Sequence, residues 1–270
     1  MFMRIISGQY RRRKLHSPPE GSITRPFPDM VKEAMFNLLR GHFEGETVLD
    51  CFCGTGTVGL EAASRGASRV VCIERDRRVT RVLEKNIEML GAEEVVEVVA
   101  GDALGPSAIH RCPKPVHIVF FDPPYAMVRD QDDWVRVRRQ FERLVGLLDD
   151  TGYAVLRTPW PLFHVLDDEQ SHDDQPVKAK SGKRARTEDR SGLGARSEQI
   201  EGEEMVEIDL DDPEAEAMIE AFEKGIAQQS SKPKPESVDV DLTMNGALGP
   251  ETHSYGQMAL HLYMRDPSAQ

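Results

Sequence analysis

The feature that most constrains the fold is a regular alternation of short apolar runs with longer amphipathic segments between residues 47 and 156. Short runs that are apolar almost throughout are typical of strands buried on both faces of a sheet. The segments between them, such as 76–91 and 132–147, repeat apolar residues at helical spacing. Because strands separated by helices pair in parallel, the pattern predicts an α/β fold on a parallel sheet. The expected strands are 48–49, 70–73, 95–99, 116–121 and 153–156.

The segments that flank this alternation predict additions to the sheet. Residues 3–15 are expected to form a short β-hairpin, and residues 29–40 a helix. Near the other end of the chain, residues 238–244 and 257–264 alternate apolar with polar side chains. Such alternation is typical of half-buried strands, so we expect these two segments to form an antiparallel pair at one edge of the sheet.

Charge is distributed unevenly along the chain. The net charge of −12 comes entirely from residues 167–250, which contain 22 acidic and 10 basic residues, whereas the rest of the chain contains 24 of each. Residues 167–197 have almost no large apolar side chains, so we expect this acidic insertion to be partly disordered. Residues 1–40 carry eight basic and three acidic residues, a balance that suits contact with a nucleic acid.

Composition excludes or disfavours several other classes of protein. No run of 18 apolar residues is present, so no membrane span is expected, and the first residues do not resemble a secretory signal. The four cysteines are too few for a disulfide framework, which favours reduced thiols and a cytoplasmic location. Cys51 and Cys53 are not followed by further ligands at a metal-binding spacing, so no metal site is expected.

A glycine-rich turn follows the first expected strand. Gly54, Gly56 and Gly59 have the spacing G-x-G-x-x-G between a strand and a helix, which lets a nucleotide cofactor approach the backbone. Asp50 precedes this turn, where its carboxylate can meet an ammonium group but would repel a pyrophosphate. Glu74 ends the second expected strand, where it can accept hydrogen bonds from both ribose hydroxyls. The combination favours S-adenosylmethionine over NAD.

A third acidic residue, Asp102, follows the third expected strand, where its carboxylate can accept a hydrogen bond from the adenine amino group. With its neighbours in these turns it completes the set of candidate cofactor-binding residues: Asp50, Phe52, Gly54, Gly56, Glu74, Arg75, Asp102 and Ala103.

The fourth expected strand ends in the tetrapeptide Asp122-Pro123-Pro124-Tyr125, the candidate catalytic residues. Ligands of open α/β sheets bind where strands end. An exocyclic base nitrogen is a poor nucleophile because its lone pair is delocalised into the ring. The Asp122 carboxylate and the Pro123 carbonyl can accept its two N–H groups, and Tyr125 can stack on the extruded base. With the glycine turn, this tetrapeptide predicts methyl transfer to a base amino group.

At these motifs the chain resembles the RsmD family of bacterial 16S rRNA guanine-N2 methyltransferases. The resemblance is carried by residues 3–11, 24–37, 49–67, 122–125 and 254–263. It implies a Rossmann-like class I methyltransferase fold: a seven-stranded, mostly parallel sheet with an antiparallel edge strand and an N-terminal β-hairpin arm that binds RNA. It also implies that the target guanine lies at Asp122-Pro123-Pro124-Tyr125. The candidate RNA-binding residues are Arg4, Arg11, Arg12, Arg13, Lys14 and Arg25.

We therefore divide the chain into three regions. Residues 1–23 are the basic hairpin arm, and residues 24–166 with 251–266 form the methyltransferase domain. Residues 167–250 are the acidic insertion, which replaces a short connection in the resembling family, so the resemblance predicts nothing for it. The expected partner is ribosomal RNA or the small ribosomal subunit, and the insertion is a candidate site for a basic protein.

Two other functions remain open on the sequence. A DNA or RNA adenine-N6 methyltransferase would share both motifs. A DNA enzyme would also need a target-recognition region, for which the acidic insertion, with Phe222 as its only aromatic residue, is poorly suited. A ribosome-assembly protein that binds through the insertion is the other alternative, although the intact tetrapeptide favours catalysis.

Overall fold

The computed structural model describes residues 3–21, 27–165 and 237–269, which belong to one compact unit. Arg25 and residues 166–236 lie outside the described residues. The predictions of partial disorder and of a basic protein partner therefore concern residues that are mostly not described. Residues 237–250, which we assigned to the insertion, belong to the same compact unit as the sheet.

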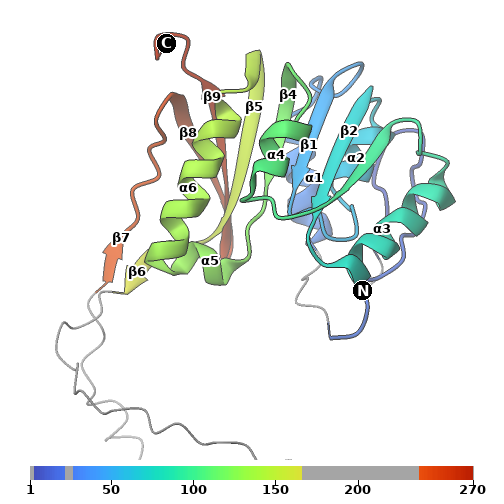
Figure 1. The fold of residues 1–270 in the computed structure, drawn as a ribbon, viewed down its shortest axis with the longest axis horizontal. Helices are drawn as coiled ribbons and strands as arrows, with labels where there is room; N and C mark the ends of the chain where they lie inside the picture. The colour runs from blue at the N-terminus through green and yellow to red at the C-terminus, as the bar shows by residue number, and fades with distance from the viewer. Residues whose placement is uncertain (1–2, 22–26, 166–236, 270) are drawn as a thin grey trace, which may run out of the picture. The chain divides into compact units, whose positions relative to one another are not determined.

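The described residues contain six helices and nine strands (Figure 1). The helices are α1 (Asp29–Leu38), α2 (Gly59–Ser64), α3 (Arg77–Leu90), α4 (Pro106–Arg111), α5 (Tyr125–Arg129) and α6 (Gln131–Val145). The strands are β1 (Thr47–Cys51), β2 (Arg69–Glu74), β3 (Val96–Ala100), β4 (Val116–Phe121), β5 (Leu148–Pro159), β6 (Phe163–Val165), β7 (Ser237–Asp239), β8 (Ala247–Tyr255) and β9 (Met258–Arg265). None of the helices in this part of the chain is long and apolar enough to cross a membrane.

Seven strands form one sheet in the order β3-β2-β1-β4-β5-β9-β8. Strands β1 to β5 pair in parallel, and β9 pairs with β5 and β8 in antiparallel fashion. The predicted seven-stranded, mostly parallel α/β fold is confirmed. The chain leaves β1 toward β2 and β3 on one side, whereas β4 and β5 lie on the other. Open α/β sheets bind ligands at such a switch point, next to the carboxyl ends of the strands.

Both faces of the sheet are covered by helices, as the continuous apolar strands predict. Along β1, Val48 belongs to one hydrophobic cluster and Leu49 to the other, because successive strand residues point to opposite faces. The first cluster includes residues of α1, α2 and α3, and the second includes residues of α4, α5 and α6. In Figure 1, α4 and α6 lie in front of the sheet, and α1 and α2 lie behind it.

The antiparallel edge differs from the sequence prediction. Residues 257–264 match β9, but their expected partner, 238–244, is wrong: the strand beside β9 is β8. Only residues 238 and 239 of that expected segment lie in a strand, β7, which pairs with β6 in a separate two-stranded sheet. The apolar alternation still leads to burial, because Met244 is buried and Leu242 packs against the second cluster without sheet hydrogen bonds. The Tyr263 hydroxyl donates instead to the Leu242 carbonyl at 2.8 Å.

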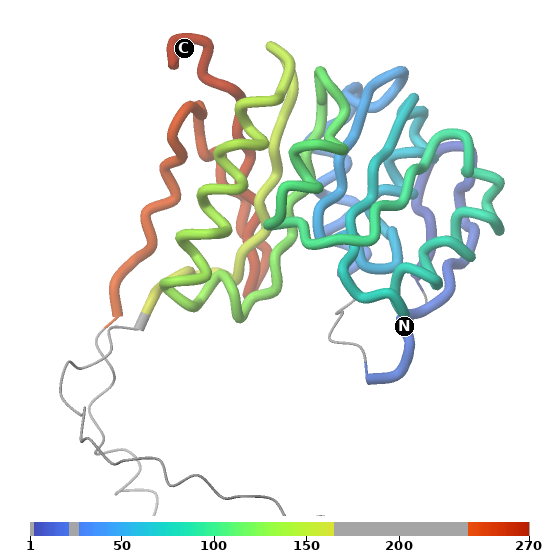
Figure 2. Tube along the Cα trace, viewed as in Figure 1, coloured from blue at the N-terminus to red at the C-terminus, as the bar shows by residue number. Residues whose placement is uncertain are grey.

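The N-terminal arm folds back on itself and packs against α2 and α3. Arg4 and Lys14 form an antiparallel bridge, and backbone hydrogen bonds join Ile5 to residues 12 and 13, so the predicted hairpin pairing is present although its extended part is short. Buried Glu61 of α2 accepts hydrogen bonds from the backbone N–H groups of residues 6 and 7, at 2.7 and 2.9 Å. Figure 2 shows the blue N-terminal segment running beside α3, more than 60 residues away in the sequence.

Candidate active site

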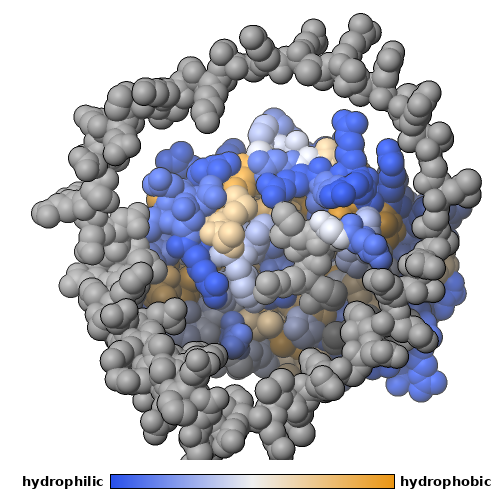
Figure 3. All heavy atoms as spheres, turned by 90° about the horizontal axis from the view of Figure 1, so that it is seen from below, coloured by the Kyte–Doolittle hydropathy of each residue, from blue (hydrophilic) through white to orange (hydrophobic). Residues whose placement is uncertain are grey.

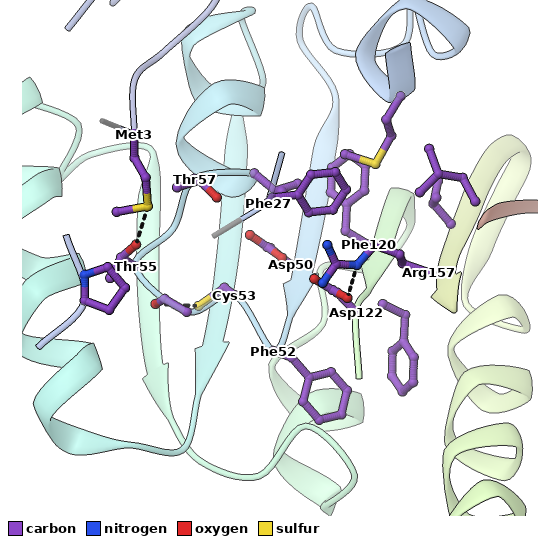
Figure 4. A pocket seen from close by; sticks show the side chains of 17 residues that line it. Met3, Phe27, Asp50, Phe52, Cys53, Thr55, Thr57, Phe120, Asp122 and Arg157 are labelled. Carbon is purple, nitrogen blue, oxygen red and sulfur yellow. Dashed lines mark hydrogen bonds and ion pairs between the residues drawn. The ribbon is translucent and has the colours of Figure 1, made fainter. Parts of the chain in front are cut away.

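A pocket opens at the carboxyl ends of β1, β4 and β5, where α2 and α5 begin (Figure 4). Its polar lining includes Asp50, Asp122 and Arg157, and its apolar lining includes Phe27 and Phe52. Figure 3 views the molecule from the side at which α5 and β6 lie in Figure 1, and hydrophilic side chains predominate on the part of that face that is visible. The pocket thus combines flat apolar surfaces with charged groups, as a site for a polar aromatic ligand requires.

The predicted glycine turn joins β1 to α2 along this pocket. Phe52 has a positive φ of 60°, which is unusual for a residue with a side chain, and its ring contacts Phe121 edge-on at 5.2 Å. Gly54 lines the pocket with a φ of 57°. Gly56 serves packing instead, because a Cβ atom there would lie 2.3 Å from a methyl carbon of Leu83. The turn therefore brings Phe52 and Gly54 to the pocket. The missing side chain at Gly56 allows Leu83 of α3 to pack closely against the turn.

Asp50 is almost completely buried near the end of β1. Its Oδ2 accepts a hydrogen bond from the Gly59 backbone N–H, the first residue of α2, at 2.8 Å. Burial raises the pKa of Asp50 to about 8, and the nearby carboxylates of Asp122 and Glu74 add to this rise. No cation among the described residues pairs with Asp50. A positive group that entered the pocket beside it would stabilise its charged form.

Glu74 ends β2 beside the glycine turn. Its carboxylate accepts hydrogen bonds from the backbone N–H groups of Gly54, at 3.0 Å, and Asp76, at 2.8 Å. Glu74 is itself half-buried, and these hydrogen bonds hold the glycine turn against its carboxylate. Figure 4 shows Asp50 and Thr57 in the same crevice.

The other cofactor candidates lie farther from the pocket lining. Arg75 and Asp102 are exposed, and the Asp102 carboxylate accepts a hydrogen bond from the Leu104 backbone N–H at 2.9 Å. Ala103 is buried in the second hydrophobic cluster, and its carbonyl accepts a hydrogen bond from Gln140. Of the eight predicted cofactor residues, Asp50, Phe52 and Gly54 line the pocket. The pocket lining does not include Gly56, Glu74, Arg75, Asp102 or Ala103.

The catalytic candidates form a rigid turn between β4 and α5. Asp122 follows β4 directly, Pro123 is buried, and the Pro124 carbonyl accepts the backbone N–H of Met127 at 2.9 Å. The Pro123 carbonyl accepts no hydrogen bond from the described residues. Burial raises the pKa of Asp122, and the charge of Arg157 opposes that rise. Tyr125 is half-buried at the start of α5.

Arg157 of β5 is a site residue that the sequence prediction missed. Its Nε donates a hydrogen bond to Asp122 Oδ1 at 2.6 Å, drawn as a dashed line in Figure 4. Its guanidinium carbon lies 4.5 Å from the centre of the Phe27 ring and 5.5 Å from that of Tyr125. The signal that points to it is a charged residue directly after the apolar run 153–156.

The basic residues of the arm are exposed but not all free. Arg11, Arg12, Arg13 and Lys14 lie on the surface, and Arg12 has a positive φ of 68°. Arg13 donates a hydrogen bond to the carbonyl of Met89 in α3 at 2.6 Å. Lys14 also has a partner, and Arg4 forms an ion pair with Asp29 at 3.4 Å. Met3 and Pro18, on either side of these residues, line the pocket. The two ends of the arm therefore reach the pocket, whereas Arg13 contacts the C-terminal end of α3.

Three comparisons bear on this site. The family model described as "Conserved hypothetical protein 95" matches residues 3–156. The chain is 38% identical over 151 residues to "Ribosomal RNA small subunit methyltransferase D" of Escherichia coli strain K12, covering 56% of this chain and 69% of that one. It is 36% identical over 126 residues to "Putative rRNA methyltransferase YlbH" of Bacillus subtilis, covering 46% and 67%.

A comparison with solved structures also finds a similar protein. The solved structure "Putative methyltransferase yhhF from Escherichia coli" superposes with a TM-score of 0.57 and 25% sequence identity, covering 100% of both chains. The residues matched by the family model include the glycine turn, Glu74 and the Asp122–Tyr125 tetrapeptide.

Proposed function

The chain belongs to the family of ribosomal RNA small subunit methyltransferase D, and on that premise we propose that it methylates the exocyclic N2 amino group of a guanine in 16S ribosomal RNA, using S-adenosylmethionine. The observation that carries the proposal is the convergence, in one pocket, of Asp50, a buried acid at the glycine turn, and Asp122, the first residue of the Asp122–Tyr125 turn.

The pocket and the glycine turn beside it offer groups that match the parts of S-adenosylmethionine. Asp50 is a buried carboxylate without a cationic partner among the described residues, which suits an ammonium group. Glu74 at the end of β2 is the acid that would accept the ribose hydroxyls, and Phe52 offers an aromatic surface at the same turn. When bound, the cofactor supplies a methyl group on a positively charged sulfur, so no metal or strongly basic side chain is needed.

The remaining residues orient and polarise the nucleophile. Asp122 Oδ2 and the Pro123 carbonyl accept no hydrogen bond from the described residues, and Asp122 lines the pocket. Each can accept one N–H of a base amino group and so draw its lone pair out of conjugation. The rigid proline turn fixes the two acceptors in advance, which is where most of the rate gain of such a transfer originates. Tyr125 at the head of α5 is placed to stack on the base.

The choice of ribosomal RNA and of guanine draws on family membership. The E. coli relative is named as a small-subunit rRNA methyltransferase, and the exposed basic residues of the arm can attract a polyanion. Guanine presents N1–H and N2–H donors side by side, which complements an acidic acceptor.

The experiment that tests this proposal compares the wild-type chain with Asp122→Ala. Both are supplied with S-adenosylmethionine labelled on its methyl group and with unmethylated small ribosomal subunits, 16S RNA or duplex DNA. We expect label in guanine of the ribosomal substrates with wild type only, while calorimetry gives the same cofactor affinity for both proteins. Label in adenine or in DNA, or loss of cofactor binding in Asp122→Ala, would contradict the assigned roles.

A further inference from the structure

The carboxylate of Asp122 has two different oxygens in this structure. Oδ1 accepts the 2.6 Å hydrogen bond from Arg157 Nε, and Oδ2 accepts none from the described residues. The Arg157 side chain is only 12% exposed, so the pair is largely shielded from water. Such charge-assisted bonds between partly buried groups hold both partners in one orientation.

Arg157 is itself held by flat contacts. Its guanidinium lies over the rings of Phe27 and Tyr125, and its neighbour in β9 is Leu260, also a pocket residue. A guanidinium stacks readily on aromatic faces, and stacking restricts its plane as well as its position. The backbone below it is fixed, because residues 154–159 pair with β9 and residues 153–156 pair with β4.

From this geometry we infer that Arg157 is a positioning residue for methyl transfer: it ties up Oδ1 of Asp122 and directs Oδ2 toward the amino group of the target base. The inference rests on the proposed function, and it adds a residue from β5 to a site otherwise built from β1, β2 and β4. The Tyr125 contact extends the same control to the stacking residue, because one guanidinium touches both the acceptor and the aromatic ring.

The ion pair with Arg157 opposes protonation of the Asp122 carboxylate. Arg157 faces it from β5, Asp50 is the ionisable group that couples to it from β1, and Tyr125 lies on α5. Burial raises the pKa of Asp122 and so favours its protonated form, which would be a weaker acceptor. Arg157 is the cation among the described residues that pairs with Asp122, and its charge and hydrogen bond oppose that rise.

The test measures single-turnover methyl transfer at saturating S-adenosylmethionine from pH 5 to 9 with wild type, Arg157→Gln and Arg157→Lys. Removal of the cation raises the pKa of Asp122, so we expect the acid limb of the Arg157→Gln profile to move to higher pH. We also expect its rate at pH 7 to fall about 100-fold, the usual scale of a misplaced catalytic group. Arg157→Lys keeps the positive charge but lacks the planar guanidinium that stacks on the rings. Compared with Arg157→Gln, it should bring the acid limb of the pH profile back toward wild type more than it restores the rate.

Two controls separate this role from a structural one. Arg136→Gln removes an exposed arginine of α6 that is also paired with an aspartate, Asp133, and it should leave rate and profile unchanged. In a double-mutant cycle, Arg157→Gln should cost little further activity in a chain that already carries Asp122→Asn, because its effect passes through that side chain. Cofactor affinity from calorimetry should be the same in all variants.

An Arg157→Gln protein with wild-type rate and acid limb would overturn the inference while leaving the proposed function intact. The inference would equally be overturned if Arg157→Gln caused its full loss of rate in the Asp122→Asn background. If Arg157→Gln fails to fold, Arg157→Lys decides: an unchanged rate and profile there would contradict the positioning role. A wild-type chain that transfers no methyl group to ribosomal RNA would overturn the proposed function and this inference with it.

Discussion

At the scale of single residues, the site depends on two carboxylates that are compensated differently. Asp122 is paired with Arg157, whereas Asp50 receives only a backbone N–H from Gly59. A buried acid without a counter-ion is protonated over a wider pH range. A ligand can supply the positive charge that Asp50 lacks as a partner. Because that partner favours the ionised form of Asp50, cofactor binding should depend on pH.

We predict that binding of S-adenosylmethionine releases a proton from Asp50. The pKa of Asp50 in the free protein is raised to about 8, so the group is mostly protonated at pH 7, and a bound ammonium group would lower that pKa. Calorimetry at pH 7 in buffers of different ionisation enthalpy should show release approaching one proton, and affinity should increase with pH until about 8. At pH 9 the release should vanish.

The matched control for this linkage is Asp50→Asn, which should remove both the proton release and the pH dependence of affinity. Equal heats in all buffers at pH 7 for the wild-type chain would show that Asp50 does not meet the ammonium group. The raised pKa of Asp50 also affects the stability of the unliganded protein. The pKa of this group is 3.8 in the unfolded chain and about 8 in the folded protein, so its contribution to the free energy of unfolding is lost as pH rises from about 4 to about 8.

Sequence alone identified the residues that stand at strand ends. Asp50, Glu74 and Asp122 each close an apolar run, and a parallel sheet brings such ends to one edge. Arg157 could not be placed in the same way. Its contact with Asp122 depends on the register of β4 against β5, which pairs Phe121 with Leu156, and register is a property of the folded sheet.

At the scale of elements, the arm and the cofactor turn are joined through α3. The side chain of Asn86 is completely buried, and its Oδ1 accepts the backbone N–H of His16 at 2.7 Å. Its Nδ2 donates to the carbonyl of Thr55, in the glycine turn, at 3.0 Å. Thr55 in turn donates to the sulfur of Met3 at 3.7 Å. One side chain thus bridges the arm and the turn.

Asn86→Ala is therefore expected to loosen the arm and the turn together. The change leaves buried backbone groups without partners, which costs about 2 kcal/mol of the free energy of unfolding. Urea unfolding should show this loss, and limited proteolysis should cut the arm faster than in the wild-type chain. Asn37→Ala, at an exposed position of α1, is the matched control and should unfold with wild-type stability. Equal unfolding of the two variants would refute the bridge.

The charges of the arm are predicted to contribute to RNA affinity through phosphate contacts. Replacing exposed Arg11 and Arg12 with glutamate should weaken binding and reduce the slope of log affinity against log salt by about 2, because each lost phosphate contact removes about one counter-ion. Arg13 is kept, since it anchors the arm to Met89. The control replaces two arginines of α6, Arg136 and Arg139, in the same way. An unchanged slope in the arm variant would refute the role of the arm.

At the element scale, apolar–polar alternation predicted the wrong strand at the antiparallel edge of the sheet. Residues 238–244 alternate apolar and polar side chains because Leu242 and Met244 pack against the core, which an irregular segment achieves as well as a strand does. The true edge strand, β8, is exposed over most of its length and carries Gly249 and Pro250, so its sequence lacks the alternation typical of strands. Edge strands give a weak sequence signal for this reason.

At the scale of the whole molecule, the described unit contains two hydrophobic clusters, one on each face of the sheet, built from residues 3–162 and 244–263. None of the described members of either cluster lies within residues 168–197. We therefore predict that a variant without residues 168–197 unfolds at the same temperature as the full chain and binds S-adenosylmethionine with the same affinity. A clear drop in melting temperature would show that the deleted segment contributes to the fold.

The central claim, that the chain methylates N2 of a guanine in small-subunit ribosomal RNA, is tested most directly in the cell. Small-subunit RNA from a strain without this gene is compared with RNA from the parent and from the mutant complemented by wild type or by Asp122→Ala. Mass spectrometry of nuclease fragments should show a single N2-methylguanosine that is lost in the deletion strain, restored by wild type and not by Asp122→Ala. An unchanged set of methylated guanines, or the loss of a methyladenine instead, would contradict the account.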